Sequence, residues 1–238
     1  MAVAFRGVGA LVQGTTSPLT PDIDAVGAQA NDVGLLVAGT RASGGTSVTS
    51  TDWTLIDTTL NATPAPDIEL HTLRQLLSAG ETDPSVACAA PGNQWGCLLA
   101  AWSGVDATTP VDATTTEATG ASATPTSPAI TTVTDGAMVV AIVYSRATAG
   151  VWSLGTANGF TLRAAVRPGP ISIGIADMIQ APAGLVTMPV WSQSAAYDYS
   201  AQTIALRPAA DERPPASRNR PGGVERVSRP SRASASGV

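Results

Sequence analysis

Residues 85–104 read SVACAAPGNQWGCLLAAWSG, and this stretch decides the fold class. Two runs of small and apolar residues flank its central Pro-Gly-Asn segment. A Gly-Asn pair between two such runs is typical of the two-residue turn of a β-hairpin. The stretch therefore predicts an antiparallel hairpin with its turn at Gly92-Asn93, and in that register Cys88 lies directly opposite Cys97.

These two cysteines allow two interpretations. Directly opposed residues of a non-hydrogen-bonded antiparallel pair have Cα atoms about 4.5 Å apart, which is within reach of a disulfide. A reducing cytoplasm favours two buried thiols instead. The sequence leaves open a disulfide between Cys88 and Cys97, and that bond gains weight only if the protein matures outside a cell.

Strand-like stretches continue on both sides of this predicted hairpin. Residues 52–60 alternate apolar and polar side chains at their start, and residues 137–144 are apolar throughout, as in a strand buried on both faces. Residues 68–77 fit a helix or a strand, and the turn residues that flank them favour a strand. The other predicted strands are 33–37, 159–166, 171–178 and 197–208.

Composition supports the same fold class. Charged residues make up only 13% of the chain, which is less than helix-rich soluble proteins need to cover their helix surfaces. Residues 107–134 contain eleven threonines and little to bury, so we expect a long surface excursion with some edge strand. The sequence predicts an all-β protein, an antiparallel jelly-roll-like β-sandwich of roughly eight to ten strands over residues 1–208.

The chain ends in a segment of opposite charge. Residues 1–208 carry seven arginines against fifteen acidic residues, a net charge of −8, whereas residues 209–238 carry six arginines against three acidic residues, a net charge of +3. This Pro/Ser/Arg-rich composition cannot bury enough to fold alone, so we expect an extended basic arm at 209–238. The expected partner-binding residues of the arm are Arg213, Arg218, Arg220, Arg226, Arg229 and Arg232.

The charge asymmetry predicts that the arm meets an acidic surface. An acidic protein neighbour fits better than nucleic acid, because three acidic residues interrupt the arginines, the body is negative and the arm has no aromatic residue to stack on bases. No membrane contact is expected, since the longest apolar run, residues 137–144, falls far short of the roughly 18 residues that span a bilayer. The chain also begins without the pattern of an export signal.

Several stretches, in their order and approximate spacing, resemble a recurring β-sandwich module of virion proteins from tailed bacteriophages and of related bacterial proteins. They are NDVGLLVA (31–38), DWTLI (52–56), AGETDPSV (79–86), AAWSGVDATTPVD (100–112), TDGAMVVAI (134–142) and AQTIALRPA (201–209). Together they span most of residues 1–209, and Asn31 stands where a glycine is more usual. The resemblance implies a structural or host-facing phage protein, and it carries over no catalytic residues.

Few residues have the chemistry of a catalytic or metal site. The chain has no lysine for a Walker loop or a Schiff base, and its one histidine and two cysteines cannot make a closed zinc site. We interpret His71 as a structural or surface histidine, and we expect neither a cofactor nor enzymatic activity. Four acidic residues could ligate a hard cation, although aspartates that cap turns are the commoner case. They are Asp22, Asp24, Asp106 and Asp112.

The aromatic residues divide into two groups. Trp53 and Trp102 fall in strand patterns and are expected in the core. Four others lie nearer predicted turns and are candidates for a ligand or subunit face. They are Trp152, Trp191, Tyr197 and Tyr199.

Three functions follow from these features. The first is a non-enzymatic virion protein, assembled in the host cytoplasm as a small homo-oligomer (a trimer by preference), that decorates or cements the capsid or tail by binding other virion subunits. The second is a receptor- or glycan-binding module of a tail fibre, spike or head fibre that binds a host surface glycan. The third is an enzyme such as a depolymerase, which the fold permits and no motif supports.

Overall fold

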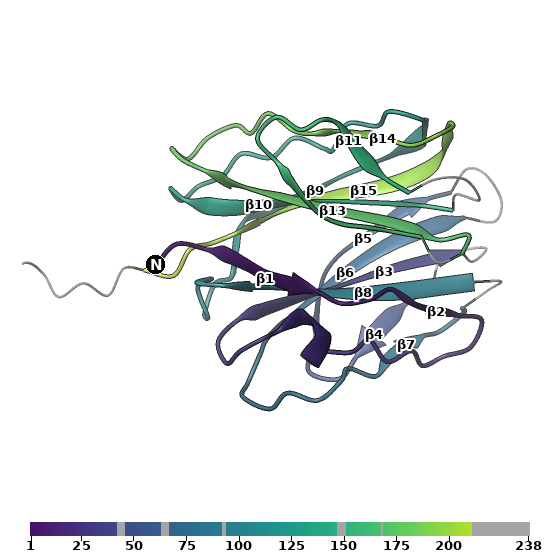
Figure 1. Cartoon of the computed structure of the whole chain (residues 1–238), viewed down its shortest axis with the longest axis horizontal. Helices are drawn as coiled ribbons and strands as arrows, with labels where there is room; N and C mark the ends of the chain where they lie inside the picture. The colour runs from purple at the N-terminus through teal and green to yellow at the C-terminus, as the bar shows by residue number, and fades with distance from the viewer. Residues whose placement is uncertain (42–45, 63–66, 92–93, 147–150, 168, 211–238) are drawn as a thin grey trace, which may run out of the picture.

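Two antiparallel sheets pack face to face in the computed structural model (Figure 1), which describes residues 1–41, 46–62, 67–91, 94–146, 151–167 and 169–210. The all-β antiparallel sandwich predicted from the sequence is confirmed. The predicted arm, with all six of its arginines, lies outside the described residues apart from its first two residues. Within the described part of the chain, no helix is long and apolar enough to cross a membrane.

The first sheet has the order β1-β8-β3-β6-β5, and β2 pairs with β8 beyond the end of β1. Strands β8 and β3 lie in its middle, and β5 forms one edge. The strands are β1 (Ala4–Val8), β2 (Val12–Gly14), β3 (Val33–Arg41), β5 (Thr54–Asn61), β6 (Ile68–Leu76) and β8 (Gln94–Ser103).

The second sheet has the order β12-β13-β10-β15-β9. A two-stranded ribbon covers part of the outer face of each sheet, β4–β7 on the first and β11–β14 on the second (Figure 1). The sheet strands are β9 (Val111–Ser122), β10 (Ala137–Ser145), β12 (Thr161–Val166), β13 (Ser172–Gln180) and β15 (Tyr197–Leu206). The ribbons are β4 (Val48–Ser50) with β7 (Val86–Cys88), and β11 (Ser153–Thr156) with β14 (Val190–Ser192); a 3-10 turn, η1, spans Asp24–Val26.

The covered outer faces explain why the central strands are apolar on both sides. In β3, Leu35 and Val37 face the second sheet, whereas Leu36 and Ala38 face η1 and the β4–β7 ribbon. Strand β10 is buried in the same way between the first sheet and the β11–β14 ribbon. A strand buried on both faces needs apolar side chains at successive positions, which is why the apolar run 137–144 correctly predicts β10.

The hairpin predicted at residues 85–104 does not form. Strand β7 pairs with β4, and β8 pairs with β3, β1 and β2 instead. Strand β8 has nine buried residues out of ten, so it gains most from the middle of the sheet, where both of its edges are paired and both of its faces are covered. The predicted turn at 92–93 lies outside the described residues.

The positions of the two cysteines follow from this strand pairing. Cys97 lies opposite Ala38 on one side and Val12 on the other, and Cys88 lies opposite Val48. Both thiols are free and buried, so the structure contradicts the disulfide and agrees with the two buried thiols. Burial raises the pKa of the Cys97 thiol to about 12, so this group stays protonated at neutral pH.

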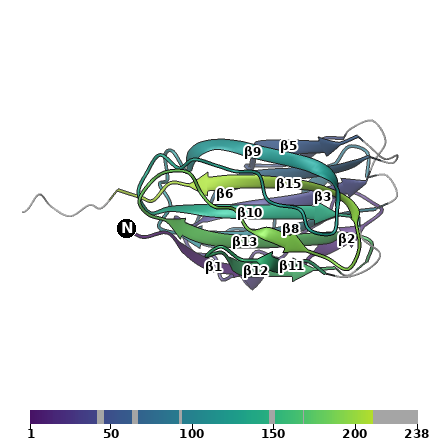
Figure 2. The ribbon, with the colours of Figure 1, turned by 90° about the horizontal axis from the view of Figure 1, so that it is seen from above.

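The chain enters and leaves the sandwich at the same end (Figures 1 and 2). The amino group of Met1 donates a 3.0 Å hydrogen bond to the carbonyl of Ala209. The Ala209 amide donates to the Gly104 carbonyl at 2.8 Å, and Val105 forms a β-bridge with Pro208. We call this group of residues (Met1, Gly104, Val105, Pro208 and Ala209) the arm root, because the predicted arm begins there.

The opposite end of the sandwich, the far end, is where β3 and β10 finish and where β6 and β15 begin. The side-chain amide of Asn61 joins the two sheets there, since it donates to the carbonyls of Gly120 and Tyr199 at 3.1 Å each. Asn61 therefore fixes the two sheets to each other at the far end, which is separated from the arm root by the length of the central strands.

Candidate functional site: a polar groove beside Glu69 and His71

Alternation along β6 places an acid and an imidazole on the outer face of the first sheet. Ile68, Leu70 and Thr72 point toward the second sheet, so Glu69 and His71 point the other way, toward the β4–β7 ribbon. Both are almost completely buried, with 1% of the His71 side chain and 2% of the Glu69 side chain exposed. A buried ionisable pair needs hydrogen-bond partners for all its polar atoms.

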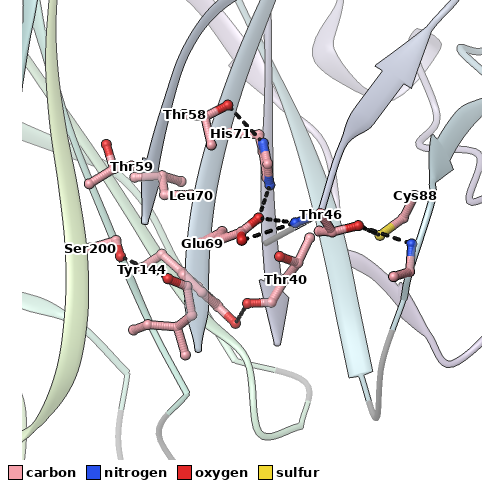
Figure 3. Close-up of polar contacts among 12 residues, drawn as sticks. Thr40, Thr46, Thr58, Thr59, Glu69, Leu70, His71, Cys88, Tyr144 and Ser200 are labelled. Atoms are coloured by element: carbon pink, nitrogen blue, oxygen red, sulfur yellow. Dashed lines mark hydrogen bonds and ion pairs between the residues drawn. The ribbon is translucent and has the colours of Figure 1, made fainter. Parts of the chain in front are cut away.

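Those partners form a chain of hydrogen bonds across two strands and the segment before β4 (Figure 3). The Thr58 hydroxyl on β5 lies 3.0 Å from Nδ1 of His71, and Nε2 of His71 lies 3.1 Å from a Glu69 carboxylate oxygen. The backbone N–H of Thr46, just before β4, donates to both Glu69 oxygens at 3.0 Å. The pair thus anchors the start of the β4–β7 ribbon to the sheet and fixes the position of the Thr58 hydroxyl.

The chain of hydrogen bonds continues from Thr46 to the end of β7 (Figure 3). Its hydroxyl oxygen accepts a 2.9 Å hydrogen bond from the Ala90 amide and lies 3.6 Å from the sulfur of Cys88. Burial raises the pKa of the Cys88 thiol, and the contact with Thr46 offsets only part of that rise. Cys88 is therefore a buried thiol that stays protonated at neutral pH and packs in the core.

The opposite face of the same strands is tied to the second sheet. The Tyr144 hydroxyl donates to the Thr40 carbonyl at 3.0 Å, and the Gln202 amide donates to the Thr59 hydroxyl at 2.9 Å and to the Leu70 carbonyl at 3.1 Å. Gly39 permits the approach of Tyr144, because a Cβ there would lie 2.5 Å from the tyrosine ring. The part of the first sheet that carries Glu69 and His71 is thus fixed to the second sheet on its inner face.

A groove of about 340 Å³ lies on the outer face of this part of the first sheet, between β5 and the β4–β7 ribbon. Hydroxyl side chains form much of its wall, and Trp53, Leu55 and Leu73 supply an apolar part. A second hollow of about 510 Å³ continues past Thr58 toward Leu60 and Ala90. The two hollows share Thr46, Ser47 and Thr58. The groove lies beside the middle of β6, at His71 and Leu73, and its continuation past Glu69, the second residue of β6, lies toward the far end.

Another hollow, of about 450 Å³, opens between β1 and the β12–β13 edge. Asp177 is buried beside it and accepts hydrogen bonds from the Trp102 indole at 2.9 Å and from Arg163 at 2.8 Å. The Arg163 guanidinium also lies 4.6 Å from the centre of the Phe5 ring. Both Asp177 oxygens are used within the protein, so this cluster joins the two sheets rather than presenting free groups to a ligand.

The structure divides the four predicted face aromatics into two pairs. Trp152 and Trp191 are 1% and 0% exposed, with ring centres 6.3 Å apart, so their prediction as a ligand or subunit face is wrong. They are the core beneath the β11–β14 ribbon, which folds back over the second sheet and covers them. Tyr197 and Tyr199 are half-buried at the far end, on either side of Asp198, which pairs with Arg146 at 3.4 Å.

The candidate cation ligands are turn and anchor residues. Asp22 accepts the Ala25 amide, and Asp106 accepts the amides of Thr108 and Thr109. These hydrogen bonds, the one from the Thr109 amide above all, lower the pKa of Asp106 to about 2. Among the described residues, no group of three or more His, Cys, Asp or Glu side chains is arranged to hold a metal ion.

Asp112 anchors the loop that follows β9. Its carboxylate accepts the amides of Val133 and Thr134 at 2.7 and 3.2 Å, and its other oxygen lies 3.4 Å from Arg207. Burial raises the pKa of Asp112, but the hydrogen bonds and the charge of Arg207 outweigh burial and leave the pKa below its ordinary value. This aspartate fixes the loop beside the arm root.

Sequence reasoning did not identify the groove. It correctly interpreted His71 as structural, since both ring nitrogens have partners inside the protein. A usable signal was the i, i+2 spacing of Glu69 and His71 within an apolar strand, which places both on one face. Thr46 and Thr58 carry no such signal, because they meet the pair only through the fold.

Comparison with protein-family models, with curated protein sequences and with solved structures gave no match. The resemblance to phage virion modules therefore stays a prediction, and the functional argument rests on the geometry above.

Proposed function

We propose that this chain is a non-enzymatic structural protein of a tailed-phage particle, and that it decorates or cements the capsid or tail surface through its arm. The observation that supports this proposal most is the arm root. The basic arm starts from one end of an acidic sandwich, where the Met1–Ala209 and Ala209–Gly104 hydrogen bonds fix its point of departure.

A fixed departure point matters for attachment. An extended segment of 28 residues, 211–238, could reach up to roughly 90 Å at about 3.3 Å per residue, which is enough to cross a neighbouring subunit. Its prolines lower the entropy cost of an extended arm. The sandwich carries a net charge of −8 and the arm is positive, so the neighbour that the arm binds presents an acidic surface. Another virion subunit, or a second copy in a homotrimer, meets this requirement.

Replacing charge within the arm tests the proposal. Changing all six arm arginines to glutamine should abolish stable incorporation into particles, whereas changing the same six to lysine should retain most of it, because charge attraction is the main contribution. The measurement is the number of copies per purified particle, by quantitative immunoblot. Normal incorporation of the glutamine variant would contradict an electrostatic tether.

The second candidate function is a receptor- or glycan-binding module. The observation that favours it is the position of the hollow that continues the groove past Thr58, which lies toward the far end and therefore away from the arm root. A protein held by its arm root would present that end outward, together with Tyr197 and Tyr199. The two functions are compatible, since one concerns the arm and the other the groove.

A further inference from the structure

The groove beside Glu69 and His71 has a neutral, hydroxyl-rich wall. Its hydroxyl groups belong to Thr46, Ser47, Thr49, Ser50 and Thr58. Neither arginine nor lysine occurs among the described residues that line this groove or the hollow that continues it. The one acid, Glu69, already accepts from Thr46 and contacts His71. An anionic ligand would therefore meet no arginine or lysine here, and a metal ion would meet a single carboxylate.

The rest of the lining is apolar. Trp53, Leu55 and Leu73 lie in the groove itself, and Leu60 lies in its continuation. Leu55 and Leu60 are 51% and 44% exposed, so they present apolar surface to solvent on the β5 edge. A ligand that fits must offer both hydrogen-bonding groups and C–H surface, on one molecule without charge. A pyranose ring has this combination.

Hydrogen bonds inside the protein orient the Thr58 hydroxyl. Glu69 accepts the Thr46 N–H with both oxygens, and in the His71 tautomer that donates from Nε2 to Glu69, Nδ1 carries no proton. Nδ1 is then an acceptor, so the Thr58 hydroxyl donates to it. The lone pairs of the Thr58 oxygen remain to accept a hydrogen bond from a ligand hydroxyl.

Ser50 supplies a second polar group. Its hydroxyl oxygen is buried in the groove wall, and it has no hydrogen-bond partner among the described residues. A buried hydroxyl without a partner costs free energy, and a ligand that pairs with it recovers that cost. Ser50 lies on the ribbon and Thr58 on β5, so the two residues line the groove from different elements.

We infer that this groove binds a neutral saccharide unit, with the hydroxyls of Thr58 and Ser50 as polar contacts and Leu55 against the sugar ring. Its volume of about 340 Å³ lies within the range of roughly 300–1,000 Å³ that is typical of small-molecule sites. The inference deepens the second candidate function, and it rests on that function only for the source of the sugar, a host surface.

Saturation-transfer NMR on the full-length protein tests the inference. The probes are the methyl glycosides of glucose, galactose, mannose and N-acetylglucosamine, with methyl glucuronide as the anionic comparison, each at about 10 mM, well above the ~1 mM dissociation constant of a weak site. At least one neutral glycoside should receive saturation, and the glucuronide should receive clearly less. The absence of transfer to every neutral glycoside, or equal transfer to the glucuronide, would overturn the inference.

Variants locate the binding in the groove. Thr58→Val keeps the shape of the side chain and removes its hydroxyl, so affinity should fall about tenfold, and Ser50→Ala should weaken binding severalfold. Thr119→Val makes the same change on an exposed position of β9, on the other sheet, and should leave binding unchanged. Thermal unfolding shows which variants are folded. If Thr58→Val does not fold, the binding measured for Ser50→Ala tests the location of the site instead. Binding that survives both groove changes places the sugar elsewhere and overturns the inference.

The two proposals can fail separately. Loss of the arm charge should reduce particle incorporation and leave sugar binding intact. The groove variants should do the reverse.

Discussion

Glu69→Ala should lower the free energy of unfolding by about 3 kcal/mol, because removing the carboxyl group leaves buried hydrogen-bonding groups without their partner. His71 would lose its contact at Nε2, and the Thr46 amide would lose both of its acceptors. In a chain of this size such a loss lowers the melting temperature by roughly 6–12 °C. Denaturant unfolding monitored by tryptophan fluorescence gives the free energy directly.

Glu69→Gln is the matched control for this prediction. Glutamine keeps the volume and one acceptor oxygen, so the loss should be about 1–2 kcal/mol, smaller than for alanine. A change of less than about 0.5 kcal/mol for Glu69→Ala is what an ordinary surface substitution gives. That result would mean that the pair does not hold the β4–β7 ribbon to the sheet.

Trp191→Ala should cost about 3–5 kcal/mol, as removal of a large buried aromatic does. Trp191 is fully buried, its indole N–H donates to the Ser127 hydroxyl at 2.8 Å, and its ring packs against Trp152. Removing it would open a cavity beneath the β11–β14 ribbon and leave the Ser127 hydroxyl without that donor. Differential scanning calorimetry measures the loss.

Tyr197→Ala provides the comparison for Trp191→Ala. Tyr197 is half-buried at the far end, and its removal should cost about 1 kcal/mol or less. Similar small losses of unfolding free energy for both variants would mean that Trp191 lies on a surface face, as the sequence predicted. A large difference between them supports its place in the core.

The sequence was informative where burial on two faces leaves a continuous apolar run. The run 137–144 corresponds to β10, and the alternation of isoleucines in 171–178 corresponds to β13. The threonine-rich stretch contains β9, which is an edge strand as predicted. The ambiguous residues 68–77 contain the strand β6. These are local properties, and local patterns can report them.

Pairing between distant segments could not be predicted in this way. Residues 85–104 contain two strands close in sequence, yet β8 pairs with β3, about sixty residues earlier in the chain, because its two apolar faces need cover from both sides. Short ribbon strands such as β4 and β14 carry too few residues to show a period, so the described residues contain fifteen strands where eight to ten were predicted. The same ribbons cover Trp152 and Trp191, and one of them forms a wall of the groove.

The candidate site could not be predicted from the sequence for the same reason. Its Glu69–His71 pair lies within one strand, but Thr58 comes from β5 and Thr46 precedes β4, and only the fold brings them together. A sequence pattern can place Glu69 and His71 on one face. It cannot supply their partners from other strands.

The central claim, that the arm holds the sandwich on a particle, is tested most directly by counting copies per particle for a chain truncated after Ala209. We expect this variant to remain folded, because the arm root hydrogen bonds and both sheets lie within residues 1–209. Its copy number on purified particles should fall to the background of the immunoblot. A truncated protein present at the full-length copy number would contradict the account.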